Sequence, residues 1–149
     1  MAPELVDRDT EHLKILSILH YAAAGLTAMV GSFPLLHVAM GAFFTFMPES
    51  MRGTGKDAFP REVGLLFMGL GLAFVAVGWS IAAAHFFTAR FLQSREHYWF
   101  CVAVSAFTCV ACMFSSGIVG IASLVVLFRT GVRDLFDGGA RAGVRAAAP

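Results

Sequence analysis

Histidine is the residue type in this chain whose placement most invites a chemical role. His20, His37 and His85 each stand inside a long apolar run, where an unpaired polar group costs several kcal/mol. Two histidines on facing helices at one depth are what a b-type haem uses as axial ligands. His20 and His85 are therefore the candidate ligands of a haem or pigment. The alternative is a hydrogen bond between helices, for which the candidate partners are Tyr21, Ser17 and Ser80.

Cysteine offers a second kind of chemistry, because Cys109 and Cys112 form a Cys-x-x-Cys pair. Thiol–disulfide exchange needs an accessible thiolate near a helix N-terminus or a cation, and a second pair to relay electrons. Here the pair lies within an apolar run, and Cys101 is the only other cysteine. We interpret the pair as small buried hydrophobic residues. A membrane thiol oxidoreductase remains a further alternative.

The common catalytic motifs are missing from this sequence. It contains no Ser-x-x-Lys, no His-Glu-x-x-His and no Gly-rich phosphate loop. Its apolar runs contain no acidic residue, although a coupled transporter usually carries an ionisable residue at mid-membrane. The sequence therefore predicts no catalytic and no metal-ligating residue, and leaves a small channel or permease as another alternative.

The elements that must position these residues are three stretches without a formal charge, 15–48, 63–89 and 97–128. Each has about 27 residues or more, whereas about 20 cross the hydrocarbon core of a bilayer as a helix. Only 14% of the residues are charged, against about 25% in a soluble domain. These patterns predict an all-α integral membrane protein.

The first and third runs are too long for one straight crossing, since they would form helices of about 50 Å in a core about 30 Å thick. Pro34 predicts a kink in the first, and Ser115 to Gly117 a hairpin break in the third. The prediction is a polytopic bundle of about four spans, in a single domain 1–137 with a flexible tail 138–149. The predicted spans are 13–33 with an extension to 47, 62–89, 96–114 and 117–136. The alternative puts the hairpin in the first run and lets the third cross once.

The basic residues orient the chain, because Lys and Arg prefer the cytoplasmic side of a membrane. In both topologies the two termini lie together on that side. Beyond the last run, Phe128, Val132 and Phe136 share a helical face while Arg129 lies on another. That pattern is typical of a helix end lying along lipid headgroups.

Small residues recur at helical spacing within the runs. Gly64, Gly71 and Gly78 fall at every seventh position, and Ser105, Cys109 and Cys112 form a comparable seam in the third run. Helices in lipid associate through close backbone approach at small residues. We therefore predict that both sets pack helices against one another.

Two stretches, 11–41 and 90–136, resemble a group of small bacterial four-helix inner-membrane proteins to which no activity is assigned. The shared features are His-Tyr at 20–21, Phe-Pro-Leu-x-His at 33–37, Tyr-x-Phe-Cys at 98–101 and Gly-x-Val-Gly at 117–120. The group's final break often reads Pro-Phe-Gly, where this chain has Ser-Ser-Gly. The resemblance implies a bacterial inner-membrane protein and no particular chemistry.

These observations favour a non-enzymatic accessory or scaffolding subunit of a larger respiratory or photosynthetic membrane complex. Its partners would be the lipid bilayer and other transmembrane subunits. A net charge of +1 gives no reason to expect nucleic acid. No cofactor is required, although haem, quinone, carotenoid or lipid would suit the histidines and the many phenylalanines. The competing hypothesis is a haem- or quinone-binding redox protein using His20 and His85.

Overall fold

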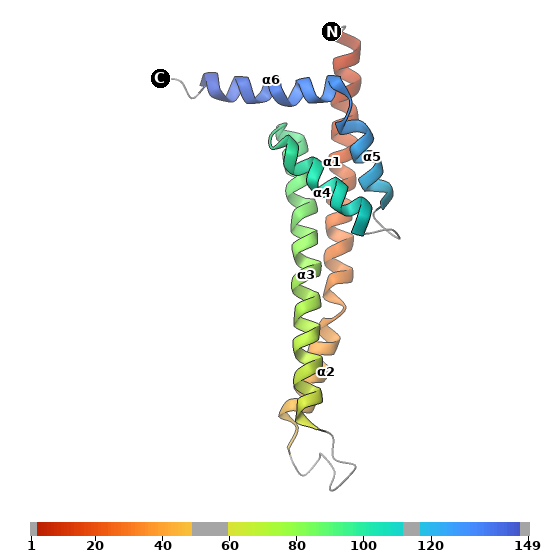
Figure 1. Cartoon of the computed structure of the whole chain (residues 1–149), viewed down its shortest axis with the longest axis vertical. Coiled ribbons are helices and arrows are strands. Elements are labelled where there is room, and N and C mark those ends of the chain that lie inside the picture. Colours follow the sequence, from red (N-terminus) through yellow and green to blue (C-terminus); the bar gives the residue numbers. More distant parts are fainter. Residues whose placement is uncertain (1–2, 49–59, 112–116, 147–149) are drawn as a thin grey trace. The chain divides into compact units, whose positions relative to one another are not determined.

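The computed structural model describes residues 3–48, 60–111 and 117–146, and within these ranges all regular structure is α-helical. The helices are α1 (Pro3–Ser32), α2 (Leu35–Phe46), α3 (Arg61–Ser94), α4 (Tyr98–Ala111), α5 (Gly117–Leu127) and α6 (Thr130–Ala146) (Figure 1). The predicted all-α class is confirmed for this part of the chain.

Two helical segments are long and apolar enough to cross a membrane, judged by length and composition alone. They are Arg8–Phe46, with 39 residues, and Arg61–Ser94, with 34 residues. Helix α4 has 14 residues and α5 has 11, fewer than the about 20 that a crossing needs. The predicted four spans are thus not confirmed. The predicted span 117–136 is also divided, because α5 ends at Leu127 and α6 begins at Thr130.

Other predicted boundaries fall differently along the chain. Gly117 opens α5, while Ser115 and Ser116 of the predicted hairpin break lie outside the described residues. Helix α6 runs to Ala146, into the region predicted as a flexible tail from 138, because Ala and Arg are strong helix formers.

The chain forms two compact units, and the predicted division into a domain 1–137 and a tail 138–149 stays a prediction. Unit 1 combines Met1–Gly25 with Ala83–Pro149, and unit 2 is Leu26–Ala82. Helices α1 and α3 contribute residues to both units. Each unit is described below by itself.

Unit 2 is held together by close backbone approach at glycines. A Cβ atom added to Gly78 would lie 2.7 Å from the Cα atom of Gly31, and one added to Gly41 would lie 2.5 Å from the backbone nitrogen of Met68. The facing pairs are Gly31 with Gly78, Val38 with Gly71, Gly41 with Met68, and Thr45 with Gly64. Each step forward on α1 and α2 matches an equal step backward on α3, so the pairing is antiparallel in one register.

That constant register defines the break at Pro34. The proline lacks a backbone N–H, and the chain turns locally, with the Phe33 N–H donating to Val30 O at 3.0 Å and the Val38 N–H to Pro34 O at 3.1 Å. Because α2 continues along α3 in the direction that the end of α1 took, the break is a kink. The alternative topology, which placed a hairpin in the first run, is inconsistent with this pairing.

Side chains in unit 2 are distributed with the large apolar groups outside. Met29, Phe33 and Leu66 are 68%, 66% and 66% exposed, whereas Gly41, Gly64 and Gly71 are buried. A water-soluble helix pair has the opposite arrangement, because its large apolar side chains face inward.

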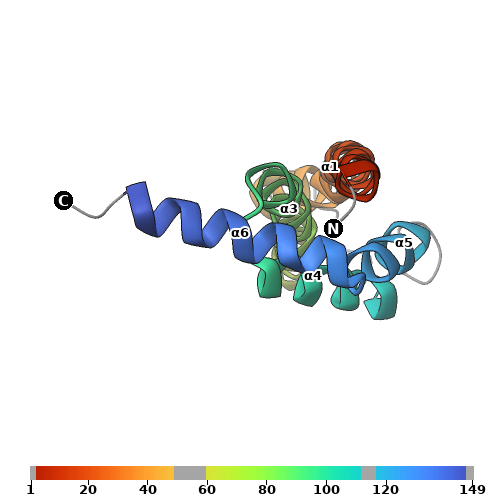
Figure 2. The ribbon, with the colours of Figure 1, turned by 90° about the horizontal axis from the view of Figure 1, so that it is seen from above.

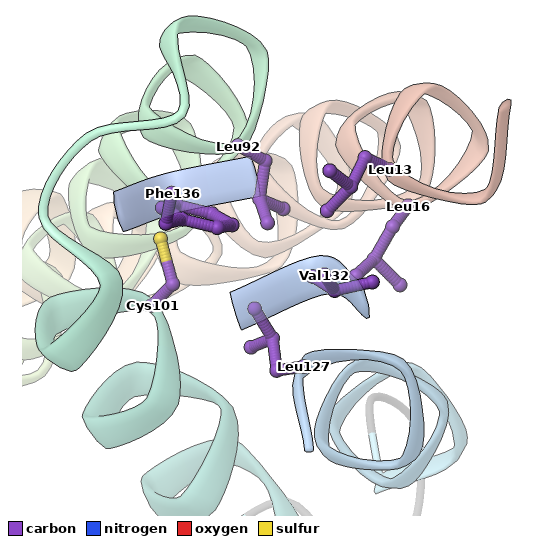
Figure 3. Close-up of a cluster of buried hydrophobic side chains, with 7 residues drawn as sticks. All are labelled: Leu13, Leu16, Leu92, Cys101, Leu127, Val132 and Phe136. Atoms are coloured by element: carbon purple, nitrogen blue, oxygen red, sulfur yellow. The ribbon is translucent and has the colours of Figure 1, made fainter. Parts of the chain in front are cut away.

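Unit 1 has a compact apolar cluster to which five helices contribute (Figure 3). Its members are Leu13 and Leu16 of α1, Leu92 of α3, Cys101 of α4, Leu127 of α5, and Val132 and Phe136 of α6. Helix α6 runs crosswise to the unit 1 part of α1 (Figures 1 and 2). The Tyr98 hydroxyl donates to Leu127 O at 2.9 Å and so satisfies a terminal carbonyl of α5.

A tight corner joins α3 to α4. Arg95 and His97 adopt left-handed backbone angles, with φ of 58° and 50°, and the Glu96 N–H donates to Phe91 O at 3.1 Å. This is the Schellman arrangement that ends many helices, with arginine where glycine is usual. The corner brings α4 back against α3 within unit 1, where Phe100 packs edge-on against Phe91 at 5.4 Å between ring centroids.

Candidate functional site: a buried histidine pair

The two histidines singled out in the sequence meet in unit 1. His20 on α1 and His85 on α3 are both fully buried, and their Nδ1 atoms lie 3.0 Å apart. The His20 Nε2 atom lies 2.9 Å from the Ser123 hydroxyl on α5. Three helices therefore meet at one imidazole pair.

The hydroxyl of Ser123 determines where the protons of this pair lie. Ser123 donates its single proton to Val119 O at 2.6 Å, so toward His20 it can only accept. His20 Nε2 must then carry a proton. In a neutral ring the Nδ1 atom of His20 is then unprotonated, and it accepts a hydrogen bond from the Nδ1–H of His85. The Nε2 atom of His85 is therefore unprotonated, and its lone pair has no hydrogen-bond donor.

That lone pair is one of two unsatisfied polar atoms. Among the side chains that the structure describes, His85 Nε2 and Ser105 Oγ are buried without a hydrogen-bond partner. Both residues are fully buried. An unpaired buried acceptor costs about 1–3 kcal/mol, so the His85 Nε2 atom is the nitrogen of the pair that is left free to accept a hydrogen bond.

Three other buried hydroxyl groups of unit 1 donate to helix carbonyls. Ser17 donates to Ala89 O at 2.9 Å and so links α1 to α3. Thr88 and Thr108 donate to Ala84 O at 2.8 Å and Val104 O at 2.7 Å, within their own helices. The buried polar side chains that the structure describes include no Asp, Glu, Lys or Arg, so the pair has a neutral surrounding.

This geometry constrains the haem hypothesis. Ligation by both histidines would place the iron and its macrocycle between two imidazole nitrogens, but here the nearest nitrogens are 3.0 Å apart and the ring centroids 5.2 Å. The pair would have to separate to admit haem. Ligation by His85 Nε2 alone needs no separation of the pair, since a ligating histidine usually donates its other N–H to a fixed acceptor, here His20.

The described residues do not provide a ligand set for a metal ion without a macrocycle. No group of three or more His, Cys, Asp or Glu side chains comes together there. A single imidazole would have to be joined by ligands from elsewhere.

The predicted hydrogen-bond partners of His20 are engaged elsewhere. Ser17 bonds Ala89 O, Ser80 bonds Ala76 O at 2.7 Å, and the ring of Tyr21 packs against Phe86 at 5.5 Å between centroids. Ser123 was missed by the sequence prediction. Its position three residues after Gly120, on the same helical face, is the signal that could have found it.

The predicted packing residues lie at helix contacts. In unit 2, Gly64, Gly71 and Gly78 all face the kinked α1–α2 segment. In unit 1, a Cβ added to Gly120 would lie 2.9 Å from both Ser105 O and Cys109 N, so α4 and α5 approach closely at this seam. Cys112 lies outside the described residues.

The described cysteines form no disulfide. Cys101 is buried and Cys109 partly buried, and neither is bridged. The Cys101 sulfur lies 4.0 Å from Thr88 O, where it packs as a small apolar group between α4 and α3.

No family model, curated protein or solved structure matches this chain. Its function is therefore argued from the geometry of its own residues. The resemblance to small bacterial inner-membrane proteins remains an expectation from the sequence.

Proposed function

We propose that this chain is an integral protein of the bacterial cytoplasmic membrane, and that it serves as a non-enzymatic accessory subunit of a larger membrane complex. The supporting observation is the distribution of side chains in unit 2, with glycines at the helix contact and large apolar groups outside. In this proposal the two segments that are long and apolar enough to cross a membrane, Arg8–Phe46 and Arg61–Ser94, are the spans, and both termini are cytoplasmic.

The arrangement follows from the solvent. In water, burial of large apolar side chains is the main stabilising term, and exposing them on both helices of a pair would be costly. In lipid the tails are as apolar as leucine, so helices gain instead from close backbone contact at small residues. The contact made by Gly31, Gly41 and Gly71 is of the second kind.

An aromatic ridge in unit 1 is the surface best suited to a partner helix. We define it as Phe86, Phe87, Phe91 and Phe100. Neighbouring rings in the ridge lie 5.4–6.3 Å apart between centroids, and Phe86 and Phe87 are about half exposed. Rigid aromatic side chains are enriched where proteins bind one another. Partner subunits are therefore proposed to dock at this ridge.

The test is the size of the particle that carries the chain in mild detergent. Native gels and mass spectrometry of copurifying proteins should show a complex much larger than the 149-residue monomer. The Phe87→Ala variant should migrate at low mass, whereas Val125→Ala, which also trims an exposed apolar side chain, should stay in the complex. A chain that migrates alone in mild detergent would remove the subunit proposal.

A redox protein with a haem is the second candidate, and the unpaired His85 Nε2 atom is the observation that favours it. Protein purified gently from a haem-replete membrane should then show a Soret band. Because one nitrogen would carry the iron, the band should disappear in His85→Ala and persist, shifted, in Ser123→Ala. Colourless wild-type protein would exclude this candidate.

A further inference from the structure

Unit 2 contains a small pocket, open to the surface, beside the Pro34 kink; it is called the cavity below. It has a volume of about 140 Å³ and is lined by Pro34, His37, Phe67, Leu70, Gly71 and Phe74. The kink and the missing side chain of Gly71 let the backbones approach, since a Cβ there would lie 3.1 Å from Pro34 O. The cavity therefore lies where α2 begins and faces α3.

His37 is exposed, unlike the buried pair of unit 1, and its ring has no hydrogen-bond partner within the described residues. Its one ring contact is with Phe67, at 6.2 Å between centroids and 17° between planes. If the helices lie in lipid, as proposed above, no solvent water would satisfy the imidazole there, and an unpaired polar group costs several kcal/mol. An ionisable side chain within a membrane segment is therefore a candidate functional group.

The lining restricts the ligand. No formally charged residue lines the cavity, so a neutral molecule fits and a phosphate headgroup does not. The volume of about 140 Å³ is below the roughly 300–1,000 Å³ of pockets that enclose a drug-sized ligand, so it accommodates one small ring and excludes a tetrapyrrole. Leu70 and Phe74 are both more than half exposed and offer an apolar path for a tail.

We propose that this cavity binds the head ring of an isoprenoid quinone or quinol. The flat ring lies against Phe67, and the imidazole of His37 donates to a quinone carbonyl or accepts from a quinol hydroxyl, since neutral histidine has one nitrogen of each kind. Gly71 lies ten residues into α3 from Arg61, about 15 Å along its axis, which is a depth that a lipid-soluble quinone reaches. The inference rests on the proposed membrane location and is independent of the subunit role.

The experiment is photolabelling of the full chain in phosphatidylcholine nanodiscs with an azido derivative of a short-chain ubiquinone. Labelling should saturate at one quinone per chain, and unlabelled decylubiquinone should displace it. The labelled peptides should be those that contain His37 or Phe67. Loss of one hydrogen bond should weaken apparent affinity about tenfold in His37→Phe. His37→Gln keeps a donor and an acceptor and should stay within about threefold of wild type.

A second pair of variants separates binding from folding. Leu70→Trp fills the cavity from an exposed position and should abolish saturable labelling, whereas Leu36→Trp, at an exposed position outside the lining, should not. Labelling that spreads over the apolar surface without saturation, or that is unchanged in His37→Phe and Leu70→Trp, would overturn the quinone site. A chain that cannot be recovered in nanodiscs would instead overturn the membrane location.

Discussion

At the scale of single residues, the hydrogen bonds of the histidine pair all run in one direction. Its order is set by Ser123, whose bond to Val119 O makes it an acceptor toward His20. Each nitrogen then has one fixed role as donor or acceptor, and the chain of hydrogen bonds ends at His85 Nε2. A proton or metal entering the pair from outside therefore has one free nitrogen to bind.

This proton arrangement is directly measurable. Nitrogen-15 spectra of histidine-labelled protein should show His20 protonated at Nε2 and His85 at Nδ1, because Ser123 can only accept from His20. A proton on His85 Nε2 and none on its Nδ1 would contradict this direction of hydrogen bonding.

Two substitutions divide the roles of His85. Asparagine places an amide N–H near the position of Nδ1, so His85→Asn should keep the bond to His20 and remain within about 1 kcal/mol of wild-type stability. Glutamine reaches the position of Nε2 and loses the Nδ1 donor, so His85→Gln should cost about 1–2 kcal/mol. Denaturation in SDS measures both. Equal losses in the two variants would show that the bond to His20 does not stabilise the fold.

At the scale of elements, the helix contacts in unit 2 depend on the absence of side chains. A Cβ at Gly41 would lie 2.5 Å from Met68 N and 2.7 Å from Gly64 O, both backbone atoms that cannot rotate away. A Cβ at Gly69, on the same helix as Met68, would meet nothing within 4 Å. Gly41 and Gly69 can therefore be compared directly, because Gly41 lies at a close helix contact and Gly69 faces open space.

We expect Gly41→Ala to destabilise unit 2 by about 1–3 kcal/mol, because α2 must move away from α3. Gly69→Ala should be neutral or stabilising by up to about 1 kcal/mol, since alanine is the better helix former and nothing is displaced. The free energy of unfolding in SDS tests both. A Gly41→Ala variant as stable as Gly69→Ala would show that α2 and α3 are not in close contact.

Sequence patterns predicted these elements unevenly. The heptad spacing of Gly64, Gly71 and Gly78 indicated which face of α3 packs, and Pro34 marked the kink, because glycine and proline act through local backbone geometry. The partners on the other helix were not predictable, since pairing Gly41 with Met68 depends on a register that emerges only when both helices are placed. The division at Phe128 and Arg129 was missed although the uncharged run ends at Phe128, because the apolar face formed by Phe128, Val132 and Phe136 continues beyond it.

The site was predicted to a similar degree. An imidazole in an apolar run must find a partner, which identified His20 and His85, but not that they would bond one another. Ser123 resembles many other serines in the sequence, and its role depends on α5 folding back beside α1. Tertiary contacts between distant segments decided these features, and a single sequence carries no signal of such contacts.

At the scale of the whole molecule, the exposed apolar surface decides the solvent. Val77 lies at the middle of α3 and is 58% exposed. In water, a substitution at such a position changes stability by about 0.5 kcal/mol or less. In a bilayer the same position faces hydrocarbon, where an arginine at the centre of a helix costs about 2.5–3.5 kcal/mol of insertion free energy.

The Val77→Arg substitution should therefore lower the ratio of inserted to released chain by about two orders of magnitude. Gln93→Arg adds the same charge at an exposed position near the end of α3, where arginine reaches the headgroups, so its insertion should match wild type. The measurement is the fraction of chain that stays with vesicles after a carbonate wash. Two results together would show that these helices lie in water. The wash would release the wild-type chain, and the Val77→Arg variant would be as soluble and as stable as Gln93→Arg.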